Sequence, residues 1–531
     1  MIRREGVLPA DAPTFSAFLD ADLLNYGYAL LSTSLGLLET AEDDTTGQLT
    51  LTREGFIQSS YAIEAATRNA TPRPDLVFHN VVAGAASHLA GYAARAYSLI
   101  HASRASGRLT PMEHTLADLL MRDLSAIEQR TRRLRSSAQV SDEAMLSAFT
   151  APDVDPDLDV LDDLDDAADQ VGPVVLLLSE NYLSAVSAAL FAIEIGSRAL
   201  LETALQDLQL GEQASSDVSA PGPWWVYRLT RHLLEELFDT SLQTTIPQPP
   251  PPGAAADRAG RWRELRETFV ASLLARERAE IDLWPSQLHV AHRIFQDSRD
   301  LVVALPTSAG KTRIAELAIL ACLAQGRRTV YVTPLRALSA QTEHVLTRTF
   351  TPLGIRVSSL YGSMGTSDVD EDTLRSGEVV VATPEKLDFA LRSDPSVLDD
   401  VGLIVLDEGH MIGASEREVR YEAQIQRLLR RADAATRRIL CLSAVFPSDD
   451  DLDDFVAWIT DDEPNGLHRE GWRPTGQRFG LVEWRDDHAR LTITLGPEQS
   501  FIPRYFEAKK PSGRRRKLFP ADQREHVIAT A

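Results

Sequence analysis

A lysine and a threonine stand where a hydrophobic run gives way to a helical pattern. The loop between these elements consists of Pro306, Thr307, Ser308, Ala309, Gly310, Lys311 and Thr312. Backbone N–H groups in such a loop, together with a helix N-terminus, can surround phosphate oxygens. Lys311 can neutralise β- and γ-phosphate charge, and Thr312 can ligate Mg²⁺. The pattern predicts a phosphate-binding loop, although Leu305 replaces the first glycine of the usual pattern.

Two adjacent acids supply the second set of reactive side chains. Asp407 and Glu408 directly follow a hydrophobic run at 403–406. Asp407 suits the coordination shell of Mg²⁺, and Glu408 suits the base that orients and deprotonates an attacking water. Adjacent acids after a strand also arise by chance. The carboxyl ends of parallel strands lie at one edge of a sheet, so these acids and Lys311 are expected to lie close together. This combination predicts hydrolysis of a nucleoside triphosphate.

Short hydrophobic runs are expected to form the strands that position these side chains. They are apolar on both faces, which is typical of a covered parallel sheet, and they alternate with helical stretches. The runs lie at 301–305, 329–333, 379–383, 403–407 and 439–443. The sequence therefore predicts an α/β doubly wound domain with its ligand at the carboxyl ends of the strands.

The first half of the chain has a different composition and is expected to be all α-helical. Apolar residues recur there at helical spacing with charges between them, at Leu116, Leu120, Leu124, Ile127 and Leu134. A proline-rich segment follows, and it is expected to be a stiff linker. The expected organisation is a helical N-terminal domain at 1–245, the linker at 246–258, the α/β domain at 259–465 and a connecting segment at 466–531.

The overall composition restricts the possible binding partners. The 531 residues include 54 Lys and Arg against 77 Asp and Glu, for a formal charge of −23. A generally basic nucleic-acid-binding protein is therefore excluded, and any contact with phosphate must use a local patch. The two cysteines, Cys322 and Cys441, cannot build a disulfide framework, which favours a cytoplasmic location. We expect no contact with a membrane, because no apolar run is long enough to span one.

One local feature contributes strongly to this acidity. Nine aspartates lie between Asp153 and Asp169, without a lysine or arginine among them. Charge blocks of this kind are usually solvated loops, and we interpret this one in the same way. Mimicry of a nucleic acid, which would block a basic groove, is the alternative interpretation.

A series of short segments resembles one known family. The segments occur in the order Trp284-Pro285-Ser286-Gln287, 305–312, 333–338, 382–388, Asp407-Glu408-Gly409-His410, Ser443-Ala444-Val445 and 472–475. They resemble, in this order, the adenine-reading segment, motifs I, Ia, Ib, II and III, and the lead into the second motor domain of superfamily-two DExH-box helicases. Within that superfamily the chain most resembles the superkiller-like group. The resemblance implies a RecA-like P-loop domain that binds ATP and Mg²⁺.

The resemblance also implies roles for individual residues. The catalytic set would be Glu408, Asp407 and Lys311, and the metal ligands would be Thr312 and Asp407. ATP would contact the loop 306–312, with Gln287 at the adenine base. A nucleic-acid strand would be held through Pro334, Arg336, Thr383 and Pro384. His410 and Ser443 would couple hydrolysis to movement of the strand, although Val445 stands where motif III usually has threonine.

The implied activity is that of an ATP-dependent nucleic-acid helicase or translocase, moving 3′ to 5′ on single-stranded or partly duplex nucleic acid. The family continues into a second RecA-like domain, whose arginine completes the nucleotide site. Since the sequence stops at Ala531, we expect a truncated or split motor. Without that arginine, the rate of ATP hydrolysis would be lower by a factor on the order of 10³–10⁵.

An alternative function stays open at this point. The chain would then be a nucleotide-responsive nucleic-acid-binding or scaffold module with little turnover of its own. Its helical half would dock a protein partner. The residues do not choose between DNA and RNA, or between repair, RNA processing and phage defence as a pathway.

Overall fold

The computed structural model describes most of the chain, in segments separated by short gaps. The described residues are 18–40, 46–68, 76–104, 109–134, 173–253, 259–360, 377–413, 415–444, 449–474, 479–485, 488–495 and 498–507. Residues 1–474 group into one unit and residues 475–531 into a second. The acidic block at 153–169 and Val445 lie outside the described residues.

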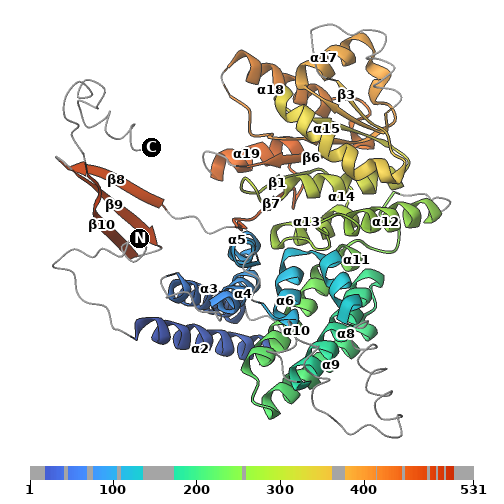
Figure 1. The fold of residues 1–531 in the computed structure, drawn as a ribbon. Coiled ribbons are helices and arrows are strands. Elements are labelled where there is room, and N and C mark those ends of the chain that lie inside the picture. The colour runs from blue at the N-terminus through green and yellow to red at the C-terminus, as the bar shows by residue number, and fades with distance from the viewer. Residues whose placement is uncertain are drawn as a thin grey trace, which may run out of the picture. The chain divides into compact units, whose positions relative to one another are not determined.

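A seven-stranded parallel sheet forms the α/β part of the first unit (Figure 1). The strand order is β3-β4-β2-β5-β6-β1-β7. The strands are β1 (Leu301–Ala304), β2 (Arg328–Val332), β3 (Val357–Leu360), β4 (Val379–Ala382), β5 (Val401–Leu406), β6 (Arg438–Ser443) and β7 (Leu467–Arg469). The predicted RecA-like α/β fold is confirmed, and each of the five hydrophobic runs forms a strand. Strands β3 and β7 were not predicted, and β7 lies in the segment that we expected to be a connector.

Helices cover both faces of this sheet. Successive residues of a strand point to opposite faces, so strands that are apolar throughout need helices on both sides. Val303 belongs to the hydrophobic cluster on one face, with α12 (Ala259–Leu274), α13 (Pro285–Gln296), α14 (Lys311–Ala324) and α15 (Arg336–Phe350). Val302 belongs to the cluster on the other face, with α17 (Pro384–Ser393), α18 (Glu416–Leu429) and α19 (Asp449–Thr460). Every residue of β1, β4 and β5 is buried, as expected for strands covered on both sides.

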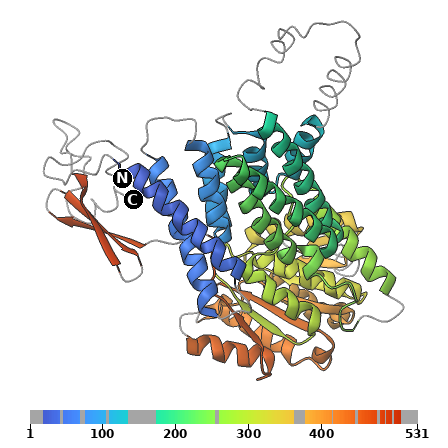
Figure 2. The ribbon, with the colours of Figure 1, turned by 90° about the horizontal axis from the view of Figure 1, so that it is seen from below.

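The described residues of the first half of the chain are α-helical, as predicted. Its helices are α2 (Leu19–Thr40), α3 (Thr46–Thr67), α4 (Leu76–Leu89), α5 (Ala93–Arg104), α6 (Pro111–Met121), α8 (Pro173–Ile195), α9 (Arg198–Asp217), α10 (Pro221–Thr240) and the short α11 (Leu242–Thr245). Residues 124–134 are also helical. Figure 2 shows α8, α9 and α10, in teal and green, packed side by side. None of the helices in the described ranges is long and apolar enough to cross a membrane.

The apolar spacing from Leu116 to Leu134 does not form one continuous helix. α6 ends at Met121, and Arg122 adopts a left-handed conformation with φ 59° and ψ 31°. The N–H groups of Arg122 and Asp123 donate to Leu119 O and Asp118 O, at 3.1 and 2.9 Å, which is the Schellman pattern of a helix end. The Arg122 side chain pairs with Asp282, 160 residues away. This long-range contact is invisible to local spacing.

The proline-rich segment packs against its neighbours where the structure describes it. The indole N–H of Trp262 donates to Pro247 O and Gln248 O, at 3.2 and 3.0 Å. The amide of Gln325 donates to Pro252 O at 2.8 Å. Residues 247–252 therefore pack against α12 and the C-terminal end of α14. The predicted domain boundaries themselves stay predictions.

The second unit contains a three-stranded antiparallel sheet in the order β10-β9-β8. Its strands are β8 (Phe479–Arg485), β9 (His488–Leu495) and β10 (Glu498–Glu507). Leu481 is 62% exposed while Trp484 and Ala489 are buried, so this sheet has one covered face. These strands were not predicted, because they are not apolar on both faces.

Buried histidines in the helical half predict a loss of stability in acid. Burial lowers the pKa of both His88 and His232 from 6.5 to about 4. Between these values the unfolded chain binds protons that the folded chain does not, so folding stability falls as the pH drops from 6.5 toward 4. The slope is roughly 1.4 kcal/mol per pH unit for each histidine. Glu236 acts in the opposite direction, because burial raises its pKa to about 7.

A comparison of the natural chain with His232→Gln separates these contributions, since Glu236 is the same in both. We expect the melting temperature to fall between pH 7 and pH 5 by less in the variant than in the natural chain. Thermal melting at the two pH values measures the difference. Equal falls in both proteins would contradict the assignment to His232.

Candidate nucleotide-binding site

The loop between β1 and α14 has the backbone geometry of a phosphate-binding loop. Gly310 is the N-cap of α14, with φ 79° and ψ 32°. A Cβ atom at this position would lie 2.0 Å from Gln287 Nε2, so both the backbone conformation and the space require glycine. The first turn of α14 begins directly after this glycine, and the N-terminus of a helix favours an anion.

The ammonium group of Lys311 is buried without a hydrogen-bond acceptor. Its side chain is 11% exposed, and Nζ lies 4.0 Å from Glu408 Oε1. Among the residues that the structure describes, Nζ has no hydrogen-bond partner. A buried charged donor normally has one. A phosphate oxygen would supply it, so the loop fits the phosphates of a nucleotide.

Asp407 follows β5 and is fixed by two donors. The Tyr331 hydroxyl donates to Asp407 Oδ2 at 3.1 Å, and the Glu408 N–H donates to Oδ1 at 3.0 Å. Burial and the neighbouring charge of Glu408 raise the pKa of Asp407, and a cation at this carboxylate would offset both effects.

The arrangement fits Mg²⁺ held jointly by protein and phosphate. No group of three or more His, Cys, Asp or Glu side chains that could hold a metal occurs among the described residues. Mg²⁺ commonly uses one or two carboxylates together with substrate phosphates and water. Asp407 offers a carboxylate, and the exposed Thr312 stands in the loop's first helical turn. Their roles as metal ligands stay predictions.

The two predicted coupling residues lie together beside Glu408. His410 Nδ1 is 3.4 Å from Glu408 Oε2 and 3.1 Å from Ser443 Oγ. Burial lowers the pKa of His410, although Glu408 opposes this. Since Ser443 ends β6, this contact joins the ends of two neighbouring strands.

Gln287, the predicted adenine contact, uses its amide within the protein. Its Nε2 donates to Gly310 O at 2.9 Å, and its Oε1 accepts from the Trp284 N–H at 2.8 Å. The neighbouring Ser286 hydroxyl donates to Ala309 O at 3.1 Å. The adenine-reading segment therefore holds the backbone of the phosphate-binding loop. Base contact by Gln287 itself stays a prediction.

The predicted nucleic-acid residues lie at the N-terminal ends of α15 and α17. These helices follow β2 and β4, which are neighbours in the sheet. Pro334, Thr383 and Pro384 are buried, and the Arg336 side chain lies outside the described part of the structure. A nucleic-acid strand bound at this edge would therefore contact backbone groups at least as much as these side chains. Binding of nucleic acid here stays a prediction.

Sequence reasoning missed three residues that shape the site. Tyr331 orients Asp407, and its signal was a hydroxyl-bearing ring between two valines of a buried strand. Cys441 packs against Gly409 so closely that a Cβ atom on Gly409 would lie 2.1 Å from the Cys441 Sγ atom. Trp472 packs against Trp284, with ring centroids 5.7 Å apart. The last two contacts join distant segments, so spacing could not reveal them.

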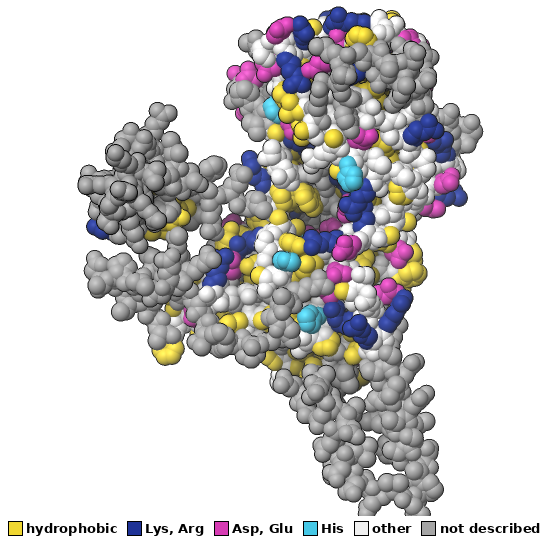
Figure 3. All heavy atoms as spheres, turned by 45° about the horizontal axis from the view of Figure 1, so that its top comes forward, with side chains coloured by type: hydrophobic (Ala, Val, Ile, Leu, Met, Phe, Trp, Pro, Cys, Tyr) yellow, Lys and Arg dark blue, Asp and Glu magenta, His cyan; other side chains and the backbone are white. Residues whose placement is uncertain are grey.

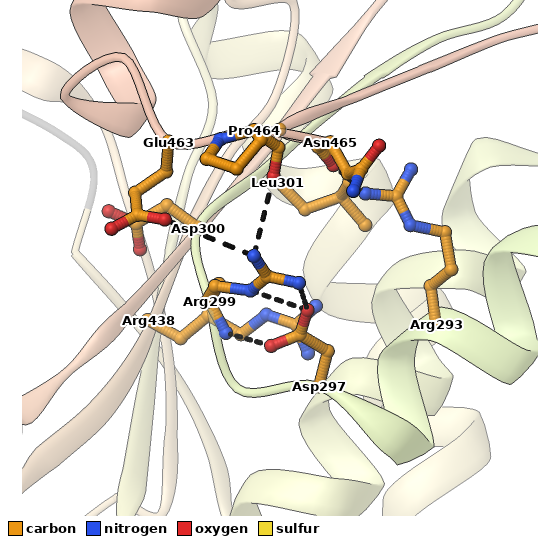
Figure 4. Close-up of a pocket in the computed structure, with 10 residues that line it drawn as sticks. Arg293, Asp297, Arg299, Asp300, Leu301, Arg438, Glu463, Pro464 and Asn465 are labelled. Atoms are coloured by element: carbon orange, nitrogen blue, oxygen red, sulfur yellow. Dashed lines mark hydrogen bonds and ion pairs between the residues drawn. The ribbon is translucent and has the colours of Figure 1, made fainter.

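A separate pocket lies at the opposite edge of the sheet, beside the start of β1 (Figure 4). Its volume is about 10 Å³, which is room for roughly one water. Arg299 bonds to Asp297 across it, with Nε and Oδ2 2.7 Å apart. This pocket is therefore distinct from the nucleotide site, which lies at the other end of β1.

Part of the α/β half is similar to known proteins. Residues 284–454 match the DEAD/DEAH box helicase family. The Hachiman protein HamB of Bacillus cereus is 31% identical over 325 residues, which are 59% of this chain and 27% of that protein. The ATP-dependent DNA helicase Hel308 of Pyrococcus abyssi is 34% identical over 221 residues, 40% of this chain and 28% of that protein. Hel308 of Methanocella arvoryzae is 30% identical over 224 residues, 41% and 29% of the two chains.

Residues 284–454 are thus similar to a helicase domain of the DEAD/DEAH box type, which supports a relation to the superfamily-two helicases. The chain spans less than a third of the length of the curated relatives it matches. The match to HamB is nearly twice as long as the segment that matches the family.

Gly409→Ala is expected to damage motif II through its contact with Cys441. The added methyl group overpacks against Sγ, at a cost of about 1–3 kcal/mol, and should weaken binding of Mg-ATP. Adding Cys441→Ala removes the sulfur and should restore binding, while Cys441→Ala alone serves as the control. Titration with a fluorescent ATP analogue measures all three variants. A double variant as weak as Gly409→Ala would contradict the steric explanation.

Tyr331→Phe is expected to raise the Mg²⁺ concentration needed for half-maximal ATP hydrolysis by roughly tenfold. The variant removes one hydrogen bond to a charged group, worth about 1.5–3 kcal/mol. Tyr421→Phe is the matched control, because Tyr421 is buried on the other face of the sheet and its hydroxyl has no hydrogen-bond partner among the described residues. If the two variants change the Mg²⁺ dependence equally, Tyr331 does not orient Asp407.

Proposed function

We propose that this chain carries the ATP-binding motor domain of an ATP-dependent DNA helicase or translocase of the superkiller-like group. The observation that supports it most directly is the buried, acceptor-free ammonium of Lys311, 4.0 Å from Glu408. Such a charge at a helix N-terminus suits a triphosphate. The choice of DNA over RNA rests on the relatives named DNA helicases.

Hydrolysis in this proposal uses residues from three neighbouring strands. Bound Mg-ATP supplies the phosphoanhydride bond and the divalent charge that stabilises the transition state. Lys311 and the N-terminus of α14 bind the phosphates, and Thr312 and Asp407 hold the metal. Glu408 orients the attacking water and accepts its proton. His410 touches both Glu408 and Ser443, so it is placed to report the state of the site to β6.

The DNA track in this proposal follows the edge formed by α15 and α17. Their N-termini present backbone N–H groups to phosphates, which gives binding without sequence preference. The arginines of α18 are already paired with acids: Arg417 with Glu385, Arg420 with Glu416 and Arg427 with Asp388. On the face drawn in Figure 3, Lys and Arg side chains lie among Asp and Glu side chains. Helix ends, more than a basic surface, would therefore hold the strand.

We place this activity in the cytoplasm. Both cysteines, Cys322 and Cys441, are buried and unpaired. Thiols of this kind persist in a reducing compartment. The helical half would provide the contact with a protein partner.

The proposal predicts Mg²⁺-dependent ATP binding and ATP hydrolysis stimulated by single-stranded DNA. Lys311→Ala should abolish binding because it removes the buried positive charge. Glu408→Gln should keep binding and lower stimulated hydrolysis by roughly 10²–10⁴-fold, which is the usual contribution of a general base. Nucleotide titration and a phosphate-release assay, with DNA and RNA of the same sequence, measure these effects.

Different outcomes separate the possible functions. Absence of Mg²⁺-dependent ATP binding by the natural chain would overturn the proposal. Tight ATP binding without nucleic-acid-stimulated hydrolysis would favour the nucleotide-responsive scaffold module. Stronger stimulation by RNA than by DNA would reassign the substrate class.

A further inference from the structure

The segment before the adenine-reading residues pairs with the helical half through its backbone. The Ala279 N–H donates to Arg122 O at 3.0 Å. The Leu242 N–H donates to Ile281 O at 2.7 Å, and the Leu283 N–H donates to Thr240 O at 2.9 Å. Ala279 and Ile281 also belong to the hydrophobic cluster of the helical half. Ala279 and Ile281 therefore pack with that half, whereas Leu283 packs in the α/β cluster beside the nucleotide site.

A buried ion pair anchors the same segment. Arg122 Nε and Nη2 donate to the two carboxylate oxygens of Asp282, at 3.0 and 2.8 Å. Their side chains are only 12% and 19% exposed. Arg122 Nη1 also donates to Leu119 O at 2.8 Å, and His88 Nε2 lies 3.4 Å from Nη2. A bidentate pair of this kind fixes direction as well as distance.

The other end of the segment holds the phosphate-binding loop. Residues 284–287 follow Asp282 after one residue, and Ser286 and Gln287 bond to the carbonyls of Ala309 and Gly310. Glu280 pairs with Arg313, in the first turn of α14. The segment 279–287 thus contacts the helical half on one side and the loop that precedes Lys311 on the other.

We infer that Arg122 is a positioning residue for the nucleotide site, and that the helical half sets ATP affinity through Asp282 and the segment 279–287. This inference rests on the proposed function, because it requires ATP to bind at Lys311. A partner that shifts α6 relative to α10 would then change ATP affinity without touching the nucleotide. By linkage, ATP would change the affinity for that partner equally.

Arg122→Lys tests the inference, because it keeps the charge and loses the bidentate geometry. We expect the affinity for a fluorescent ATP analogue with Mg²⁺ to fall by roughly fivefold, a common size for coupling between sites. Arg130→Lys is the matched control. Arg130 pairs with buried Asp118 at 2.6 Å in the same helical half, and its substitution should leave ATP affinity unchanged.

A double-variant comparison distinguishes positioning from general loosening. If Arg122 acts through the adenine-reading segment, Arg122→Lys should have a much smaller effect on affinity in a chain that already carries Gln287→Ala. A purely structural role would give additive effects. Additive effects, or an equal loss in Arg130→Lys, would overturn the inference.

A second pair of substitutions covers the case in which Arg122→Lys does not fold. Arg122→Met combined with Asp282→Leu removes both charges of the pair, so neither partner is left without the other. We expect this variant to fold and to bind the ATP analogue more weakly, and unchanged affinity would overturn the inference. Failure of the natural chain to bind the analogue would instead count against the proposed function.

Discussion

A buried ammonium group without an acceptor is the constraint around which the α/β half is organised. Removing the charge of Lys311 from water is costly unless an anion faces it, and the only compensation of that kind recorded for the described residues is Glu408 at 4.0 Å. The parallel sheet makes this arrangement possible, because β1 and β5 end at the same edge. The tyrosine on β2, the serine on β6 and the glycine at the N-cap of α14 all refine the geometry around that charge.

The helical half is joined to this site more closely than a flexible tether would allow. Ala279 and Ile281 belong to its hydrophobic cluster, and Ser286 and Gln287, a few residues later, bond to the phosphate-binding loop. The proline-rich stretch is also packed, through Trp262 and Gln325. The two halves therefore share a structural element, although their compositions suggested separate bodies.

The sequence predicted the parts of the fold that depend on local pattern. Runs that are apolar on both faces became β1, β2, β4, β5 and β6, and the loop at Lys311 and the acids at Asp407 came together as expected. Contacts between distant positions were not predictable. The pairing of Arg122 with Asp282 spans 160 residues. The role of Tyr331 depends on the order of the strands, and the contact of Gly409 with Cys441 joins two separate segments. Strand β8 was not predicted, because Glu483 and Arg485 interrupt its apolar run.

The paired arginines of α18 have a kinetic consequence. Each opposite charge lies within 3 Å of its partner, so their fields largely cancel a short distance from the surface. A chain with a formal charge of −23 would also repel a polyanion at long range. Capture of a strand at this face would therefore gain little from electrostatic steering, and its rate would be limited by how often a random collision has the right orientation.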